Sequence, residues 1–287
     1  MAVLFRQSRT TRTSAPAATP YRPGIADLTP RLLPRLWPYW VTVYRRTWRG
    51  SVITSFLMPF LYLTAMGIGL GSFVDDNAGP AALGGISYLA YIAPGLLATS
   101  AMQTAIGEST YPVMGAFKWH RVYFSMAATP LRVADIVGGQ LAFTAFRILL
   151  SGAVFLGVLA GFGVLDSAAG GLGALAVAVL LGAAHAAPTI ALTSRMRSES
   201  GFALVFRLGL MPMFLFSGAF FPITQLPDAV AWLARLMPIW HGVELSRMLT
   251  LGDVVVLPAV GHLGYLVVLL LLGWYLSITG FVKRLSQ

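Results

Sequence analysis

The chain has 287 residues and a formal net charge of +10; 57% of its residues are hydrophobic, only 10% are charged and none is cysteine. A soluble domain carries about 25% charged residues, so this chain has too few polar side chains to cover a surface that faces water. The composition therefore predicts an all-α, polytopic membrane protein of roughly six spans, since one spanning helix takes about 20 apolar residues. It excludes a disulfide framework and a cysteine metal site.

The first 50 residues are predicted to form two segments ahead of the first span. Residues 1–29 are rich in Arg, Thr, Ser, Ala and Pro and lack the apolar core of a cleavable signal peptide, so we expect a flexible cytoplasmic tail. In residues 30–50, Trp and Tyr side chains share one helical stripe, with arginines beside it. That pattern is typical of an amphipathic interfacial helix, which lies in the headgroup layer.

Residues 51–287 form the predicted transmembrane domain. We expect six spans, at residues 52–73, 88–106, 136–162, 172–192, 202–221 and 261–281. With both termini in the cytoplasm, 16 of the 20 Lys and Arg residues fall in cytoplasmic segments and two fall outside. This bias follows the positive-inside rule, so the sequence predicts a multi-pass protein of the cytoplasmic membrane rather than a partner of nucleic acid.

Several enzyme motifs are absent from the sequence. A P-loop needs a lysine directly after glycine, and the only lysines, Lys118 and Lys283, follow other residues. Metal-ligand clusters, nucleophile elbows and acid dyads are missing too, so we expect no catalytic residue and no metal or cofactor in this chain itself. No acidic residue falls within the middle of a span, which argues against an ion-coupled secondary transporter. That class and a membrane-embedded lipid-modifying enzyme remain the alternative hypotheses.

The third expected span carries a polar face. Its members recur at i, i+4, i+7 and i+11: Gln140, Thr144, Arg147 and Ser151. Inside a bilayer such a face must point toward other helices or a water-filled path. Two interpretations stay open: these side chains line a substrate pathway, or they form a structural bond to carbonyls on a neighbouring helix.

The longest internal loop, residues 107–135, is too apolar and aromatic for a plain linker. Phe117, Arg121 and Phe124 are spaced along one helical face, with Lys118, Trp119 and His120 beside them. A short amphipathic helix of this kind can dock into a groove of a soluble partner. The alternative is an interfacial helix that touches only lipid.

After the fifth expected span, three prolines divide an amphipathic stretch into short helical pieces. Phe202 to Phe221 is apolar, and Pro222, Pro227 and Pro238 follow it. We expect re-entrant helices that cap a transport pathway from outside. The candidate gate residues are Phe216, Ser217, Gly218, Phe220, Phe221, Pro222, Pro227, Trp240 and His241.

Four blocks together resemble the permease subunits of ABC-2-type exporters, in the branch of the nodulation lipo-oligosaccharide and daunorubicin-type efflux permeases. The blocks are Leu61 to Gly71, Ala93 to Glu108, Thr129 to Asp135, and Phe216 to Pro222 continued by Gln225 to Pro227 and Pro238 to Arg247.

The resemblance implies a permease that exports an amphipathic substrate: a lipid-linked glycan, a glycolipid or a drug. It implies a dimer, identical or mixed, that binds two separate ATPase subunits, which hold ATP and Mg. It also implies that residues 117–124 form the coupling helix, that Glu108 lies in the region contacting the ATPase, and that the stretch after Pro222 closes the pathway.

Overall fold

The computed structural model describes residues 28–71, 73 and 85–286, and every regular element within them is a helix. The all-α class is confirmed for this part of the chain. Almost all of the expected tail, residues 1–29, lies outside the described residues.

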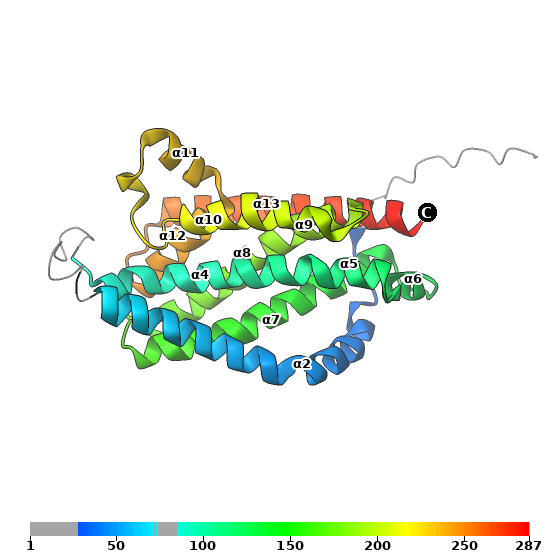
Figure 1. The fold of residues 1–287 in the computed structure, drawn as a ribbon, viewed down its shortest axis with the longest axis horizontal. Coiled ribbons are helices and arrows are strands. Elements are labelled where there is room, and N and C mark those ends of the chain that lie inside the picture. The colour runs from blue at the N-terminus through cyan, green and yellow to red at the C-terminus, as the bar shows by residue number, and fades with distance from the viewer. Residues whose placement is uncertain (1–27, 72, 74–84, 287) are drawn as a thin grey trace, which may run out of the picture.

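The N-terminal part of the described chain is one long helix. Helix α2 (Leu33–Tyr62) continues into a π-helix, η1 (Leu63–Leu70), and bends along its length (Figure 1). The interfacial helix expected at residues 30–50 and the first span expected from residue 52 are therefore not separate elements. Gly50 stands alone between them, and a single glycine weakens a helix by about 1 kcal/mol without ending it.

Four helical stretches are long and apolar enough to cross a bilayer. They are α4 (Tyr88–Ser109) with its extension α5 (Tyr111–Lys118), α7 (Val133–Gly161), α8 (Ala168–Arg195) and α13 (Val256–Leu285). They coincide with the second, third, fourth and sixth expected spans and are candidate spans by their length and composition. The first and fifth do not meet that criterion within the described residues.

The helix of the fifth expected span ends earlier than the sequence predicts. It consists of α9 (Phe202–Leu204), the π-helix η4 (Val205–Leu210) and α10 (Met211–Leu215). The expected end at Phe221 is wrong because Gly218 has a left-handed backbone (φ 76°) and the Ser217 hydroxyl accepts the backbone N–H of Ala219. Both features turn the chain before Pro222 is reached.

Three short helices follow, each with a proline at or just before its start, as the sequence predicts. They are η5 (Ile223–Gln225), α11 (Asp228–Leu236) and α12 (Pro238–Thr250). Helix α12 packs against α8, α4 and α13, while α11 projects away from the bundle (Figure 1).

Helix α8 lies at the centre of the packing, in contact with α13, α4, α12 and α7.

Asp135, in the first turn of α7, fastens the start of the described chain to this bundle. Its carboxylate accepts the backbone N–H groups of Arg31 (2.6 Å), Leu32 (2.7 Å) and Arg132 (2.9 Å). Hydrogen bonds to a charged acceptor are stronger than neutral ones, so this carboxylate sets where α2 begins against α7.

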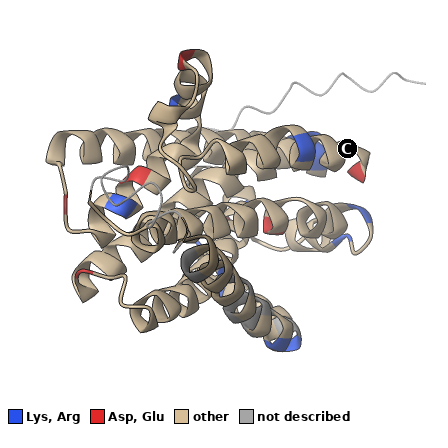
Figure 2. Cartoon of the chain, turned by 60° about the vertical axis from the view of Figure 1, so that its left-hand side comes forward, with Lys and Arg blue, Asp and Glu red and all other residues tan. Residues whose placement is uncertain are grey.

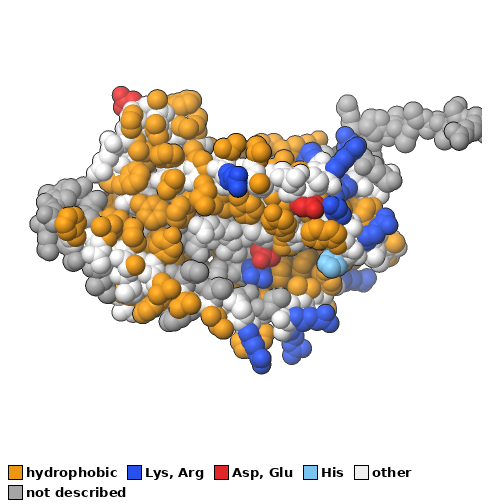
Figure 3. All heavy atoms as spheres, viewed as in Figure 1, with side chains coloured by type: hydrophobic (Ala, Val, Ile, Leu, Met, Phe, Trp, Pro, Cys, Tyr) orange, Lys and Arg blue, Asp and Glu red, His pale blue; other side chains and the backbone are white. Residues whose placement is uncertain are grey.

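The two ends of the bundle differ in charge. The α5 and α6 (Val122–Ala127) hairpin lies at the same end as the C-terminus, and α11 and α12 lie at the other (Figure 1). On the face shown in Figure 3, Lys and Arg side chains gather toward the α5–α6 end, and hydrophobic side chains cover much of the surface between the ends. The ribbon between the ends carries few charged residues (Figure 2).

Candidate functional site

The segment expected to form one coupling helix is a helical hairpin. Helix α5 ends at Lys118, residues 119–121 turn, and α6 begins at Val122. Arg121 has a left-handed backbone (φ 51°), which breaks the helix. The prediction that Phe117, Arg121 and Phe124 share one continuous helical face is therefore wrong.

Phe117 anchors the hairpin to the bundle. Its side chain is 2% exposed, and its ring lies 4.8 Å from that of Tyr123 and 4.7 Å from that of Phe281. The Arg284 guanidinium stacks over it at 4.2 Å. Phe117 therefore contacts other parts of this chain and does not form an exposed docking surface.

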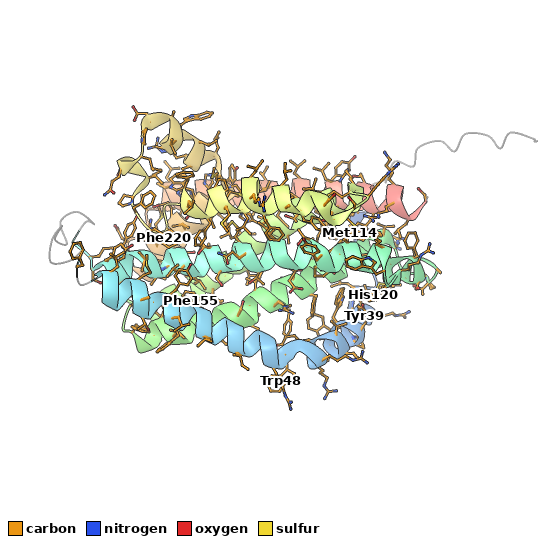
Figure 4. The ribbon with its side chains drawn as sticks, viewed as in Figure 1. Tyr39, Trp48, Met114, His120, Phe155 and Phe220 are labelled. Carbon is orange, nitrogen blue, oxygen red and sulfur yellow. The ribbon has the colours of Figure 1, made fainter. Side chains whose placement is uncertain are left out.

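The tip of the hairpin carries the exposed residues of the predicted coupling set. Trp119 is 53% exposed, and His120 and Arg121 are exposed beside it, with Arg121 over the ring of Phe124 at 5.0 Å. Figure 4 shows His120 at this end of the molecule. Aromatic and arginine side chains together are typical of protein interfaces.

Lys118 ties the hairpin to the loop after α8. Its Nζ lies 2.8 Å from Glu199 Oε2, and this hydrogen bond holds the pKa of the Glu199 carboxyl below its usual value. The pair is exposed, so solvent screens its attraction and it adds little to the stability of the fold. Its effect is to keep two loops of one end together.

A polar network joins the hairpin to two spanning helices. The Tyr123 hydroxyl donates to Gln140 Oε1 (2.9 Å), and Gln140 Nε2 donates to the backbone oxygen of Glu108 (3.2 Å). Arg147 Nε lies 3.3 Å from Glu108 Oε1. Burial raises the pKa of Tyr123, so its hydroxyl remains a donor. The network links α6, α7 and α4. It joins Glu108, expected near the ATPase, to Gln140 and Arg147, expected in the pathway, and it includes Tyr123, which the sequence did not single out.

The predicted pathway face of α7 is mostly closed in this conformation. Gln140 and Thr144 are buried, and the hydroxyls of Thr144 and Ser151 donate to backbone oxygens of α7 itself. Arg147 forms an ion pair with the Glu108 carboxylate on α4, where the sequence suggested backbone carbonyls of a neighbouring helix as one possible partner.

A polar face on α4 was missed by the sequence reasoning. Thr99, Ser100 and Gln103 line a cavity of about 120 Å³, and Gln103 is exposed although it lies within an apolar helix. The walls opposite come from three other helices: Tyr62, Phe155 and Phe214. The signal was present, since positions 99 and 103 lie one helical turn apart.

At the α11–α12 end of the bundle, the backbone oxygen of Gly218 joins α4 to α12. It accepts the Tyr91 hydroxyl of α4 (3.2 Å) and Arg247 Nη2 of α12 (2.8 Å). Arg247 also binds Glu244 (2.6 Å) and stacks over the Tyr91 ring at 4.0 Å. A tight approach supports this junction, because a Cβ at Gly95 would lie 2.7 Å from the Cα of Ala219. The turn at 216–222 is thus clamped between α4 and α12.

An aromatic cluster packs α12 against α13. His241 Nδ1 lies 2.8 Å from His262 Nδ1, and the His241 ring stacks on Tyr265 at 4.0 Å, with Trp240 edge-on to both histidines. Burial, and the neighbouring His262 ring, lower the pKa of His241 to about 4. His241 is therefore neutral at physiological pH.

The nine predicted gate residues differ in how far they are buried. Ser217 and Gly218 are buried, Pro227 is exposed, and the partly buried ones are Phe216, Phe220, Phe221, Pro222, Trp240 and His241. The Phe220 ring contacts Phe214 at 5.0 Å, and Figure 4 shows Phe220 near the outer part of α4. Within the described residues, no group of three or more His, Cys, Asp or Glu side chains could hold a metal ion.

Comparison with known proteins shows the family of the chain. The ABC-2 type transporter family model matches residues 36–251. Nodulation protein J from Rhizobium leguminosarum bv. trifolii is 34% identical over 261 residues, which cover 86% of this chain and 94% of that protein. Nodulation protein J from Sinorhizobium fredii (strain NBRC 101917 / NGR234) is 34% identical over 256 residues, with the same coverage, and that from Rhizobium meliloti (strain 1021) is 30% identical over 258 residues, covering 85% and 93%. The chain belongs to the ABC-2 type transporter family and is an integral membrane transport protein.

Proposed function

We propose that the chain is the transmembrane permease subunit of an ATP-binding-cassette exporter. A separate ATPase subunit, in two copies, hydrolyses ATP with Mg, and a second permease subunit, identical or different, completes the assembly. The substrate is amphipathic: a lipid-linked glycan, a glycolipid or a drug. Family membership and the similarity to Nodulation protein J over most of both chains support this assignment.

In the proposed topology, six spans cross the cytoplasmic membrane and both termini are cytoplasmic. Helix α2 with η1 is the first span, and α9 to α10 is the fifth. The α5–α6 end faces the cytoplasm, and η5, α11 and α12 form the outer re-entrant cap. The gathering of Lys and Arg at the α5–α6 end supports this orientation.

The proposed mechanism rests on the contacts that helix α4 makes toward its two ends. In α4, Glu108 lies in the polar network at one end, and the Tyr91 hydroxyl, toward the other end, donates to Gly218 in the turn at residues 216–222, here called the gate turn. Glu108 and Tyr91 are 17 positions apart, about 26 Å along a helix. A displacement of the hairpin tip, Trp119 to Arg121, would reach α4 through Tyr123 and Gln140, and would then act on Gly218.

The polar face of α4 is the proposed lining of the pathway. Thr99, Ser100 and Gln103 lie between the network and the gate turn on the same helix. Hydroxyl and amide groups can meet the polar part of an amphipathic substrate, and the aromatic walls of that cavity can meet its apolar part. The gate opens when the contacts of Gly218 with Tyr91 and Arg247 break.

The test compares two exposed Trp–Arg pairs at opposite ends. Trp119→Ala with Arg121→Glu alters the hairpin tip, and Trp232→Ala with Arg235→Glu alters α11. Co-reconstituted with its ATPase, the first variant should lose ATP-driven export and ATPase binding by about tenfold or more, because it removes interface anchors. The second should keep ATPase binding. Normal export and binding by the hairpin variant would exclude this coupling route.

A further inference from the structure

A basic cavity lies at the α5–α6 end of the bundle, apart from the polar network. Its volume is about 380 Å³, and it is formed by the last turns of α8 and α13 and by the loop after α8. Four of its seven lining residues are cations, Arg195, Arg197, Lys283 and Arg284, and none is acidic. The cavity therefore concentrates positive charge.

Two of the four cations are fixed by the protein itself. Arg284 Nη1 donates to the backbone oxygens of Thr193 (2.9 Å) and Met196 (3.0 Å), so it caps the C-terminal end of α8. Arg195 donates to the backbone oxygen of Ala191 (2.7 Å) and to Thr279 Oγ1 on α13 (3.0 Å). These bonds hold two guanidinium groups in place as walls of the cavity.

The other two cations have no carboxylate partner among the described residues. Arg197 and Lys283 are exposed, and neither forms an ion pair with a carboxylate in the described part of the chain. Glu199, the acidic residue nearest to Arg197 in the sequence, is bound by Lys118 at 2.8 Å. Positive charge gathered at one cavity repels itself, and an anion in the cavity would remove that cost.

The mouth of the cavity continues the lipid-facing surface of α13. Leu272, Leu276, Thr279 and Lys283 follow at i, i+4, i+7 and i+11, so they share one face. Leu272 and Leu276 are exposed, and on α8 the exposed Leu192 comes one turn before Arg195. The apolar surface thus ends where the cations begin, the order expected of a surface that runs from the acyl chains of a bilayer to its headgroups.

We propose that this cavity binds a phosphate group, supplied by the headgroup of an anionic phospholipid in the leaflet on the α5–α6 side. Arg197 and Lys283 contact the phosphate, and Arg195 and Arg284 form the wall behind it. Free inorganic phosphate has the same chemistry, but the position at the end of the lipid-facing surface favours the lipid.

Native mass spectrometry tests this proposal. The full chain is measured in detergent, with equal amounts of phosphatidylglycerol and phosphatidylcholine added. Wild type should retain phosphatidylglycerol preferentially. The double variant Arg197→Gln, Lys283→Gln should lose that preference by roughly fivefold for each cation removed. The exchange Arg197→Lys, Lys283→Arg is the matched control, because it keeps both charges and should keep the lipid. A preference unchanged in the Gln variant would overturn the proposal.

Two further measurements distinguish a lipid phosphate from a soluble anion and from the surface of a protein partner. The first is a titration with inorganic phosphate in place of lipid. If phosphate binding depends on the two cations and wild type shows no preference for phosphatidylglycerol, the cavity binds a soluble anion and the lipid proposal fails. If the Gln variant keeps its lipid but no longer co-purifies with the ATPase, the cations belong to a protein interface and the proposal fails. Thermal unfolding of each variant confirms that it is folded.

Discussion

Arg147 and Glu108 form a largely buried ion pair, so each charge depends on the other. Removing one partner leaves the other charge in a poorly solvated site, whereas removing both avoids that penalty. We expect Arg147→Met to lower the free energy of unfolding by about 2–3 kcal/mol, and Glu108→Gln with Arg147→Met to recover part of that loss. Thermal unfolding in lipid nanodiscs measures both. Strictly additive losses would show that the two side chains do not interact.

The Tyr123 hydroxyl is the contact through which the hairpin reaches α7. Tyr123→Phe keeps the ring packing against Phe117 but leaves Gln140 Oε1 buried without its donor, which costs about 1–3 kcal/mol. We also expect fewer molecules exported per ATP hydrolysed. Tyr111→Phe is the control, because Tyr111 is exposed. Equal transport ratios in the two variants would remove Tyr123 from the coupling route.

At the scale of single residues, the sequence predicted which side chains are polar and buried but not what they bind. The spacing of Gln140, Thr144 and Arg147 correctly placed them on one helix face. Glu108, the partner of Gln140 and Arg147, belongs to another helix, and its position depends on how α4 packs across α7. Periodicity describes one helix at a time, so it cannot supply such a pairing.

At the scale of elements, the contact between α4 and the gate turn depends on Gly95. Its hydrogen leaves room for the Ala219 backbone, which a Cβ would meet at 2.7 Å. We expect Gly95→Ala to destabilise the protein by about 1–2 kcal/mol, because overpacking outweighs the gain in helix propensity. Gly107→Ala in the same helix meets nothing within 4 Å and should be neutral or stabilising. Thermal unfolding of both variants decides; equal midpoints would contradict the close approach.

The packing of α12 against α13 should depend on pH. The folded pKa of His241 is about 4, against an ordinary value of 6.5, so between these values the unfolded chain binds a proton that the folded chain does not. Stability is therefore greatest above pH 6.5 and falls as the pH drops toward 4. His241→Phe keeps the stacking on Tyr265 and should weaken this dependence, whereas His120→Phe, at an exposed site, should not. Unfolding midpoints measured from pH 7 to pH 4.5 test it; parallel curves for wild type and His241→Phe would refute it.

The helix boundaries show where local patterns fail. The sequence contains Pro222, Pro227 and Pro238, and each starts a short helix as expected, because proline acts through its own backbone. The turn at Gly218 and the break at Arg121 require left-handed backbone conformations that neighbouring elements select. Conversely, no signal at residues 50–52 stops α2, so two expected elements form one.

At the scale of the whole molecule, composition and charge were the most informative signals. They predicted a helical membrane protein, which the fold and the family membership bear out. The division into two chemically different ends also follows from the sequence, since it needs only the order of charged and apolar segments. The junction of both ends on α4 does not follow, because it depends on three contacts between residues distant in the chain: Glu108 with Arg147, Glu108 with Gln140, and Tyr91 with Gly218.

We propose that the hairpin tip docks an ATPase. Site-specific photo-crosslinking in cells tests this contact directly. A photoreactive amino acid replaces Trp119 at the hairpin tip or, as the matched control, Trp232 on α11; both positions are exposed. We expect position 119 to crosslink to a P-loop ATPase identified by mass spectrometry, and position 232 not to do so. Capture of that ATPase from position 232, or of lipid alone from position 119, would contradict it.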